Sequence, residues 1–269
     1  MTAAPPPAVD PAAPPALARD PWQRLRRHTP ARIGLGRAGG ALPTHAVLRF
    51  DAAHALARDA VHEPLDPDLL LSDVAAALDP AHRPPGRPLV VTSGAADRAA
   101  YLQRPDLGRR LGDPTAVAAV GRAHPEGFDL SLVLADGLSA RAVARHAPGL
   151  VAELVQRLPG WSLAPLVIAR QARVALGDEV GALLGARLVI VLIGERPGLS
   201  APDSLGAYLT WQPRAGRTDA ERNCVSNIRP PVGLDLAEAA RTISRLALGA
   251  RDLGLTGVGL KDSGEALTS

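Results

Sequence analysis

At 269 residues, the chain is long enough for one large domain with an appended arm or for two small domains. Only 3% of its residues are aromatic and its basic side chains are scattered among 27 acidic ones for a net charge of +3, so neither base stacking nor a basic patch favours nucleic-acid binding. The single cysteine, Cys224, excludes an internal disulfide and any site built from several cysteines. No apolar run approaches the roughly 18 residues of a membrane span. We therefore expect an intracellular, cytoplasmic protein with no nucleic-acid or membrane partner.

The N-terminal part of the sequence changes character at about residue 20. Residues 1–19 consist mainly of Pro and Ala and predict a disordered leader. Residues 20–37 carry five arginines with Trp22 and Leu25 as candidate anchors, which fits either a solvated helical arm or a surface that docks on an acidic partner. The letters GLGRAG at 34–39 match the dinucleotide fingerprint, but Pro30 leaves no room for a preceding strand, so we favour a flexible or docking loop.

Two helices are predicted before residue 88. Residues 44–61 place apolar side chains on one helical face, with Thr44 as the expected N-cap. The apolar positions of that face are Val47, Phe50, Ala57 and Val61. A second apolar run at 69–78 predicts a short helix. We expect residues 20–87 to form an N-terminal helical arm.

From residue 88 onward the sequence alternates between strand and helix patterns. Five short aliphatic runs predict strands at 88–94, 129–137, 163–170, 187–195 and 255–262. Between them, Ser139 can cap a helix that carries Val143, and apolar residues at helical spacing predict a second helix. These apolar residues are Ile243, Leu246, Ala247 and Ala250. The alternation predicts a Rossmann-like α/β domain over 88–269, with a mainly parallel sheet flanked by helices.

Polar side chains follow two of the predicted strands, where open parallel sheets bind their ligands. Asp136 and Ser139 follow one strand, and Glu195 and Arg196 follow another. Asp136 and Ser139 could contact a ligand, or they could accept hydrogen bonds from the backbone amides of a turn and a helix N-terminus. The second interpretation is at least as good as the first. For Glu195, a ligand amide and neighbouring backbone are equally good donors.

The segment at 218–230 gathers polar residues around Cys224 with no helical period, and predicts a structured loop that lines a site. A catalytic role for Cys224 is disfavoured, because a lone cysteine is more often a small buried apolar residue and no histidine stands out as its partner. His54 and His62 lack the spacing of a zinc motif. We therefore expect neither a cysteine nucleophile nor a metal site in this chain.

Taken together and in order, seven segments from about residue 20 to the C-terminus resemble the light chain of ethanolamine ammonia-lyase. They are DPWQRLRRHTPARIGLGRAGGALPT, LRFDAAHALARDAVH, YLQRPDLGRRL, LADGLSARAV, IGERPGLSAPDSLGAYLTWQPR, DAERNCVSNIRP and LTGVGLKD. The resemblance implies a hetero-oligomer in which adenosylcobalamin lies between this chain and the barrel of a large subunit. It also implies radical conversion of ethanolamine to acetaldehyde and ammonia, with the substrate and the catalytic residues in the large subunit.

The resemblance carries cobalamin contacts over to three positions, Val174, Glu195 and Cys224. It implies that Glu195 accepts hydrogen bonds from corrin amides, that Val174 offers backbone or apolar contact, and that Cys224 makes a weak polar contact. The sequence lacks an Asp-x-His-x-x-Gly motif, which agrees with the base-on cobalamin of the family. In some members of the family the N-terminal extension directs the enzyme into a bacterial microcompartment. The leader of this chain has no helical targeting pattern, which argues against that location, so the microcompartment is kept only as the alternative to the cytoplasm. The N-terminal helical arm at 20–87, and its arginine-rich part from Arg24 to Arg37 in particular, is expected to contact the large subunit.

Two other functions stay open at this point. One is an independent nicotinamide-dependent oxidoreductase that uses residues 34–39. The other is a scaffold that stabilises the large chain without touching cobalamin. Mutation of Glu195 to Ala distinguishes the scaffold from the main hypothesis, because it would leave the corrin affinity unchanged if this chain does not contact cobalamin.

Overall fold

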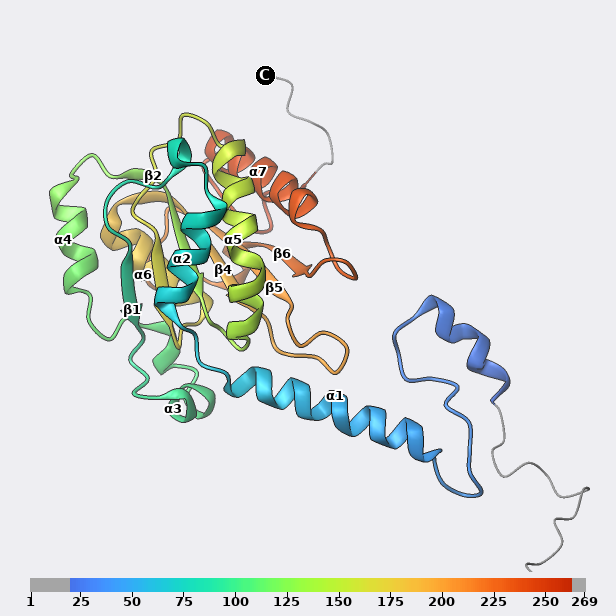
Figure 1. The fold of residues 1–269 in the computed structure, drawn as a ribbon. Helices are drawn as coiled ribbons and strands as arrows, with labels where there is room; N and C mark the ends of the chain where they lie inside the picture. Colours follow the sequence, from blue (N-terminus) through green and yellow to red (C-terminus); the bar gives the residue numbers. More distant parts are fainter. Residues whose placement is uncertain (1–19, 263–269) are drawn as a thin grey trace, which may run out of the picture. The chain divides into compact units, whose positions relative to one another are not determined.

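The computed structural model describes residues 20–262 (Figure 1). The predicted leader at 1–19 and residues 263–269 lie outside the described part. The chain divides into two compact units, residues 1–56 and 57–269. The second unit begins at Ala57, ahead of residue 88, where the sequence alone placed the start of the α/β domain.

The first unit holds a 3-10 helix, η1 (Pro21–His28), and most of the first α-helix, α1 (Thr44–His62). Asp20 caps η1, because its carboxylate accepts a hydrogen bond from the amide of Trp22 at 2.8 Å. The helix predicted over 44–61 is confirmed, and it begins at Thr44. Its apolar face is only partly covered within this chain, since Phe50 is 44% exposed.

The second unit is built on a six-stranded sheet in the order β1-β3-β2-β4-β5-β6. Four neighbouring strands are parallel, and β5 and β6 continue the sheet in antiparallel pairing. The strands are β1 (Leu89–Thr92), β2 (Phe128–Ala135), β3 (Val167–Arg170), β4 (Ala186–Gly194), β5 (Leu205–Trp211) and β6 (Asn223–Ile228). The predicted α/β class with a mainly parallel sheet is confirmed.

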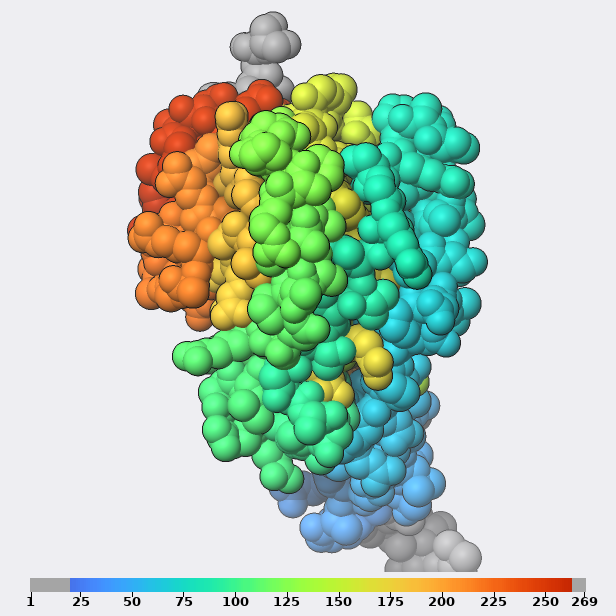
Figure 2. Space-filling view, turned by 90° about the vertical axis from the view of Figure 1, so that its left-hand side faces the viewer, coloured from blue at the N-terminus to red at the C-terminus, as the bar shows by residue number. Residues whose placement is uncertain are grey.

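Helices cover both faces of this sheet. On one face lie α2 (Pro67–Ala77), α5 (Ala140–Arg157) and α7 (Leu236–Leu253), which share one apolar core (Figure 1). On the other face lie α4 (Thr115–Ala123) and α6 (Val174–Leu184), with a second core. In Figure 2 the green helix α4 runs down the molecule, and the orange segment that leads into β6 lies off to its side. The smaller elements are α3 (Arg98–Gln103), η2 (Pro80–His82), η3 (Leu107–Arg109) and η4 (Asp219–Glu221).

Three of the predicted helices are confirmed in the second unit. The short helix expected at 69–78 is α2, and its Leu70 and Val74 are buried against the core that faces α5. Ser139 caps α5 by accepting a hydrogen bond from the amide of Ala142 at 3.2 Å. The spaced apolar residues of α7 are buried, as expected.

The strand predicted at 255–262 is wrong. Helix α7 ends at Leu253, Gly254 follows with a left-handed φ of +68°, and the chain then turns back along β6. The side-chain amide of Asn223 holds this turn by donating to the carbonyl oxygens of Gly257 and Leu260, at 3.3 and 2.8 Å. The alternating apolar pattern misled because Leu260 is buried whereas Val258 is 81% exposed. The sequence pattern resembled a strand although only one of its apolar residues, Leu260, anchors the turn.

Candidate functional site

Asp136 and Ser139 serve the structure of the turn between β2 and α5. The Asp136 carboxylate accepts hydrogen bonds from the amides of Gln171 and Ala172 at 2.7 and 3.0 Å, and it lies 3.4 Å from the guanidinium of Arg98. Burial raises the pKa of Asp136 above its ordinary value. Ser139 is also buried and donates to the carbonyl oxygen of Pro202 at 2.9 Å. The turn-and-cap interpretation of these two residues is therefore the one that the geometry supports.

Glu195 follows β4 and lies over the antiparallel end of the sheet. Its carboxylate accepts hydrogen bonds from the hydroxyls of Ser204 and Ser226, at 2.6 and 2.5 Å, and from the amide of Asn227 at 3.3 Å. Gly206 lies beneath it, and a Cβ there would come within 3.0 Å of Oε1. The missing side chain lets the carboxylate rest against the sheet. Glu195 is half-buried and fixed in orientation by its own chain.

Cys224 lies on β6, not in a loop. The predicted loop at 218–230 is wrong over most of its length, because the chain makes a 3-10 turn and then enters the edge strand. Along this strand Cys224 and Ser226 are exposed while Val225 and Ile228 are buried. Cys224 therefore shares with Ser226 the face on which Glu195 rests.

The Cys224 thiol is flanked by Tyr208, its partner in the ladder between β5 and β6. Although the residue as a whole is exposed, desolvation by the surrounding protein raises the pKa of the thiol, and its hydrogen bond with Tyr208 opposes this shift. A thiol with a raised pKa stays protonated at neutral pH, which makes it a poor nucleophile. The expectation of a non-catalytic contact residue fits this chemistry.

Val174 is the first residue of α6 and lines a cavity of about 940 Å³. Tyr208 lines the same cavity, so the cavity reaches the strand pair that carries Cys224. Arg196, the neighbour of Glu195, forms part of the same wall. The structure thus pairs Cys224 with Tyr208, joins Glu195 to the same strand through Ser226, and places Val174 in the cavity that Tyr208 also lines.

One wall of the cavity is the loop between β5 and β6. Thr218 and Glu221 form a capping box there, in which the Glu221 carboxylate accepts from the Thr218 amide at 2.8 Å. That amide, followed by the Arg217 guanidinium, lowers the pKa of Glu221 to about 2. Beneath the loop, the fully buried Arg222 and Asp178 side chains form an ion pair. The loop is therefore anchored both at its tip and at its base.

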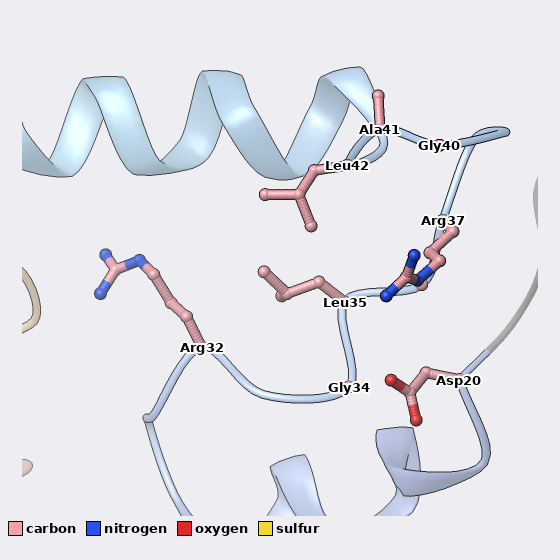
Figure 3. Close-up of a pocket in the computed structure, with 9 residues that line it drawn as sticks. Asp20, Arg32, Gly34, Leu35, Arg37, Gly40, Ala41 and Leu42 are labelled. Carbon is pink, nitrogen blue, oxygen red and sulfur yellow. The ribbon is translucent and has the colours of Figure 1, made fainter.

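The glycine-rich loop at 34–39 lies in the first unit, between η1 and α1. Gly34 has a φ of +58°, and a Cβ there would lie 2.7 Å from the backbone nitrogen of Gln23, so the close approach of the two backbone segments requires glycine. Within residues 20–262, no strand precedes the loop, and the strand–turn–helix context of a dinucleotide fingerprint is missing. Beside the loop, Figure 3 shows Leu35 and Leu42 pointing toward each other across a cavity of about 390 Å³.

Metal-binding clusters and membrane-spanning helices are both missing from the described part of the chain. Residues 20–262 contain no group of three or more His, Cys, Asp or Glu side chains placed to hold a metal ion. No helix in the same part combines the length and the apolar character needed to cross a membrane.

Comparison with known proteins decides the family. The family model described as ethanolamine ammonia-lyase light chain matches residues 19–261. The chain belongs to this family. Curated relatives, each described as an ethanolamine ammonia-lyase small subunit, include those of Ralstonia nicotianae, 52% identical over 94% of this chain and 92% of the relative, and Azotobacter vinelandii, 55% identical over 91% and 90%. A Rhodococcus erythropolis relative is 52% identical over 92% of each chain.

Membership of the light-chain family makes this protein a subunit of a carbon–nitrogen lyase. The designation of the relatives as small subunits implies a large partner subunit. Within the light chain, sequence reasoning missed the partners of Glu195, namely Ser204 and Ser226, as well as Tyr208. A sequence signal exists for Ser226, because Cys224, Val225 and Ser226 alternate between polar and apolar residues with the period of a strand.

Proposed function

We propose that this chain helps to hold adenosylcobalamin at its interface with the large subunit of an ethanolamine ammonia-lyase, which converts ethanolamine to acetaldehyde and ammonia. Substrate binding and catalysis belong to the large subunit in this proposal. The bound cofactor would supply radical chemistry by homolysis of its cobalt–carbon bond, and this chain would bind and orient it. The observation that carries the proposal is the convergence of Val174, Glu195 and Cys224 on one accessible side of the sheet.

The residues present fit a corrin. Cobalamin carries neutral amide side chains around its ring, and these need acceptors on the protein. An ionised carboxylate offers about four lone-pair positions, and three donors in the described part of the chain reach Glu195. Among residues 20–262, Oε1 accepts a hydrogen bond from Ser226 alone, so it retains capacity for a corrin amide. Cys224 and Val174 add the polarizable and apolar surface that a large flat ring requires.

Substitution of Glu195 tests the proposal in the complex with the large subunit. We expect Glu195→Ala to weaken adenosylcobalamin binding roughly tenfold or more, because a hydrogen bond to a charged acceptor contributes about 1.5–3 kcal/mol. Glu195→Gln keeps one acceptor oxygen, and its affinity for adenosylcobalamin should lie between those of Glu195→Ala and the unchanged protein. Binding is measured by equilibrium dialysis, and acetaldehyde formation is assayed with both chains together and with each alone.

The matched control is Glu126→Ala, which removes the same group from an exposed position distant in the fold. Its cofactor affinity should equal that of the unchanged complex. If Glu195→Ala binds cobalamin normally, this chain is a scaffold that does not contact the corrin. Acetaldehyde production by this chain alone would contradict the subunit proposal altogether.

We also propose that residues 20–56 contact the large subunit. Support comes from large apolar side chains that this chain leaves uncovered, including Trp22 at 59% and Leu48 at 62% exposure. Trp22→Ser combined with Leu48→Ser should reduce recovery of this chain with a tagged large subunit roughly tenfold or more, as expected for loss of interface anchors. Leu69→Ser, at an equally exposed position of α2, is the control. Equal recovery of all variants would argue against this role.

A further inference from the structure

The cavity beside Val174 is strongly basic, and the three proposed corrin contacts do not use that charge. Six arginines line it, against two carboxylates. The arginines are Arg109, Arg110, Arg173, Arg196, Arg217 and Arg222. They come from four separate parts of the chain: η3 and the residue after it, the start of α6, the residue after Glu195, and the loop before β6. A concentration of one charge in a concave site attracts the opposite charge.

Three of these guanidinium groups are uncommitted. Arg109, Arg110 and Arg196 are exposed, and none of them has a side-chain hydrogen bond or ion pair with another residue in the range 20–262. By contrast, Arg217 is engaged with Glu221 and with the carbonyl oxygen of Gln212. The uncommitted groups therefore have their donors free for a ligand.

The two carboxylates of the cavity leave most of these arginines unpaired. Glu179 uses Oε2 to accept a hydrogen bond from the amide of Leu111 at 2.8 Å. Asp219 is fully exposed and lies 3.6 Å from Arg222, at the foot of the loop. Arg217 and Arg222 therefore have carboxylate partners, whereas no ion pair in the range 20–262 engages the other four arginines.

The unpaired backbone amides at the start of α6 and the fixed guanidinium of Arg173 add to the positive potential of the cavity. Helix α6 begins in the cavity with no side-chain cap, and no acceptor among the described residues meets the amides of Val174 and Ala175. Unpaired amides and the helix dipole favour an anion at this end. Arg173 is held over the ring of Tyr101 at 4.5 Å. The Nε of Arg222, whose side chain is only 3% exposed, also lacks a partner.

We infer that this cavity binds the phosphodiester of the cobalamin nucleotide loop, an inference that rests on the proposed function. The amides of the corrin are neutral and its cobalt centre is cationic, so the phosphodiester is the one anionic group of cobalamin that matches the four arginines without a carboxylate partner. Guanidinium groups pair with phosphate oxygens through two parallel hydrogen bonds, and a helix N-terminus supplies amides to the same group. Val174 connects the two regions, because it lines the cavity and is also a proposed corrin contact.

The test compares two corrinoids that differ only by a phosphate, adenosylcobinamide and adenosylcobinamide phosphate, on the complex with the large subunit. We expect the phosphate form to bind roughly tenfold or more tightly. Arg109→Gln combined with Arg110→Gln should reduce this ratio toward one and leave the affinity for adenosylcobinamide unchanged. Both arginines are exposed and lie on a different element from Glu195, so the fold and the corrin contact should survive. Arg87→Gln combined with Arg122→Gln removes the same charge elsewhere and should keep the ratio.

Inorganic phosphate distinguishes the two sources of the anion. Two results together support the cobalamin subsite. Adenosylcobinamide phosphate binds much more tightly than adenosylcobinamide, and inorganic phosphate competes with the first corrinoid but not with the second. A ratio of one in the unchanged complex overturns it, and inorganic phosphate that still binds then marks a site for the free ion. A ratio that the Arg109 and Arg110 substitutions leave intact also overturns it. Failure of the proposed function looks different, because then Glu195→Ala would change the affinity for neither corrinoid.

Discussion

Replacing Asp136 with Ala is expected to destabilise the chain by about 3–5 kcal/mol, the range found when one member of a buried charge pair is removed. The substitution leaves the amides of Gln171 and Ala172 without an acceptor and takes the carboxylate away from Arg98. Gln171 has a left-handed φ of +53°, a conformation that its surroundings must hold in place. Asp136 therefore ties the end of β2 to the end of β3, where the parallel strands finish.

Chemical denaturation of the full chain, followed by circular dichroism, measures this loss. Asp136→Asn is the informative companion, because it keeps the size of the side chain and one acceptor oxygen, and it should lose clearly less stability than Ala. A loss below about 1 kcal/mol for Asp136→Ala would mean that the turn is held by other contacts. In that case ligand binding would again be a competing explanation for the Asp136 carboxylate.

Asp178→Ala should cost a similar amount, about 3–5 kcal/mol, because it leaves the guanidinium of Arg222 buried without its counter-ion. The two side chains are 1% and 3% exposed, so water cannot replace the lost partner. Arg222 also donates to the carbonyl oxygen of Arg217, at 3.0 Å from each of its terminal nitrogens. Loss of the pair should therefore loosen the loop that walls the arginine cavity as well as lower the global stability.

A double substitution separates charge burial from packing. Asp178→Leu combined with Arg222→Met removes both charges, and it should recover most of the stability lost by Asp178→Ala, since apolar replacements of buried pairs are often neutral or stabilising. The control is Asp106→Ala at the exposed pair with Arg104, which should leave the denaturation midpoint almost unchanged. If the double variant is no more stable than Asp178→Ala, packing around these residues, rather than the unpaired charge, explains the loss.

The class of the fold and the location of its main elements can be predicted from local patterns in the sequence. Strands β2, β3 and β4 fall within aliphatic runs that are buried on both faces, and such runs are legible without knowing their neighbours. The cap at Ser139 and the apolar spacing of α7 are equally local signals. Seven ordered segments also identified the family. All of these signals depend on residues close together in the chain.

The set of residues that meet at the candidate site depends on how distant segments pack together. Strand β6 is an edge strand with polar side chains on its exposed face, so its sequence resembles a loop until its pairing with β5 is known. Glu195 gains its partners Ser204 and Ser226 because an antiparallel turn brings β5 and β6 beside the end of β4. The arginine cavity arises in the same way, from segments that meet only after folding. Sheet order and register depend on contacts between distant residues, and local propensity does not encode those contacts.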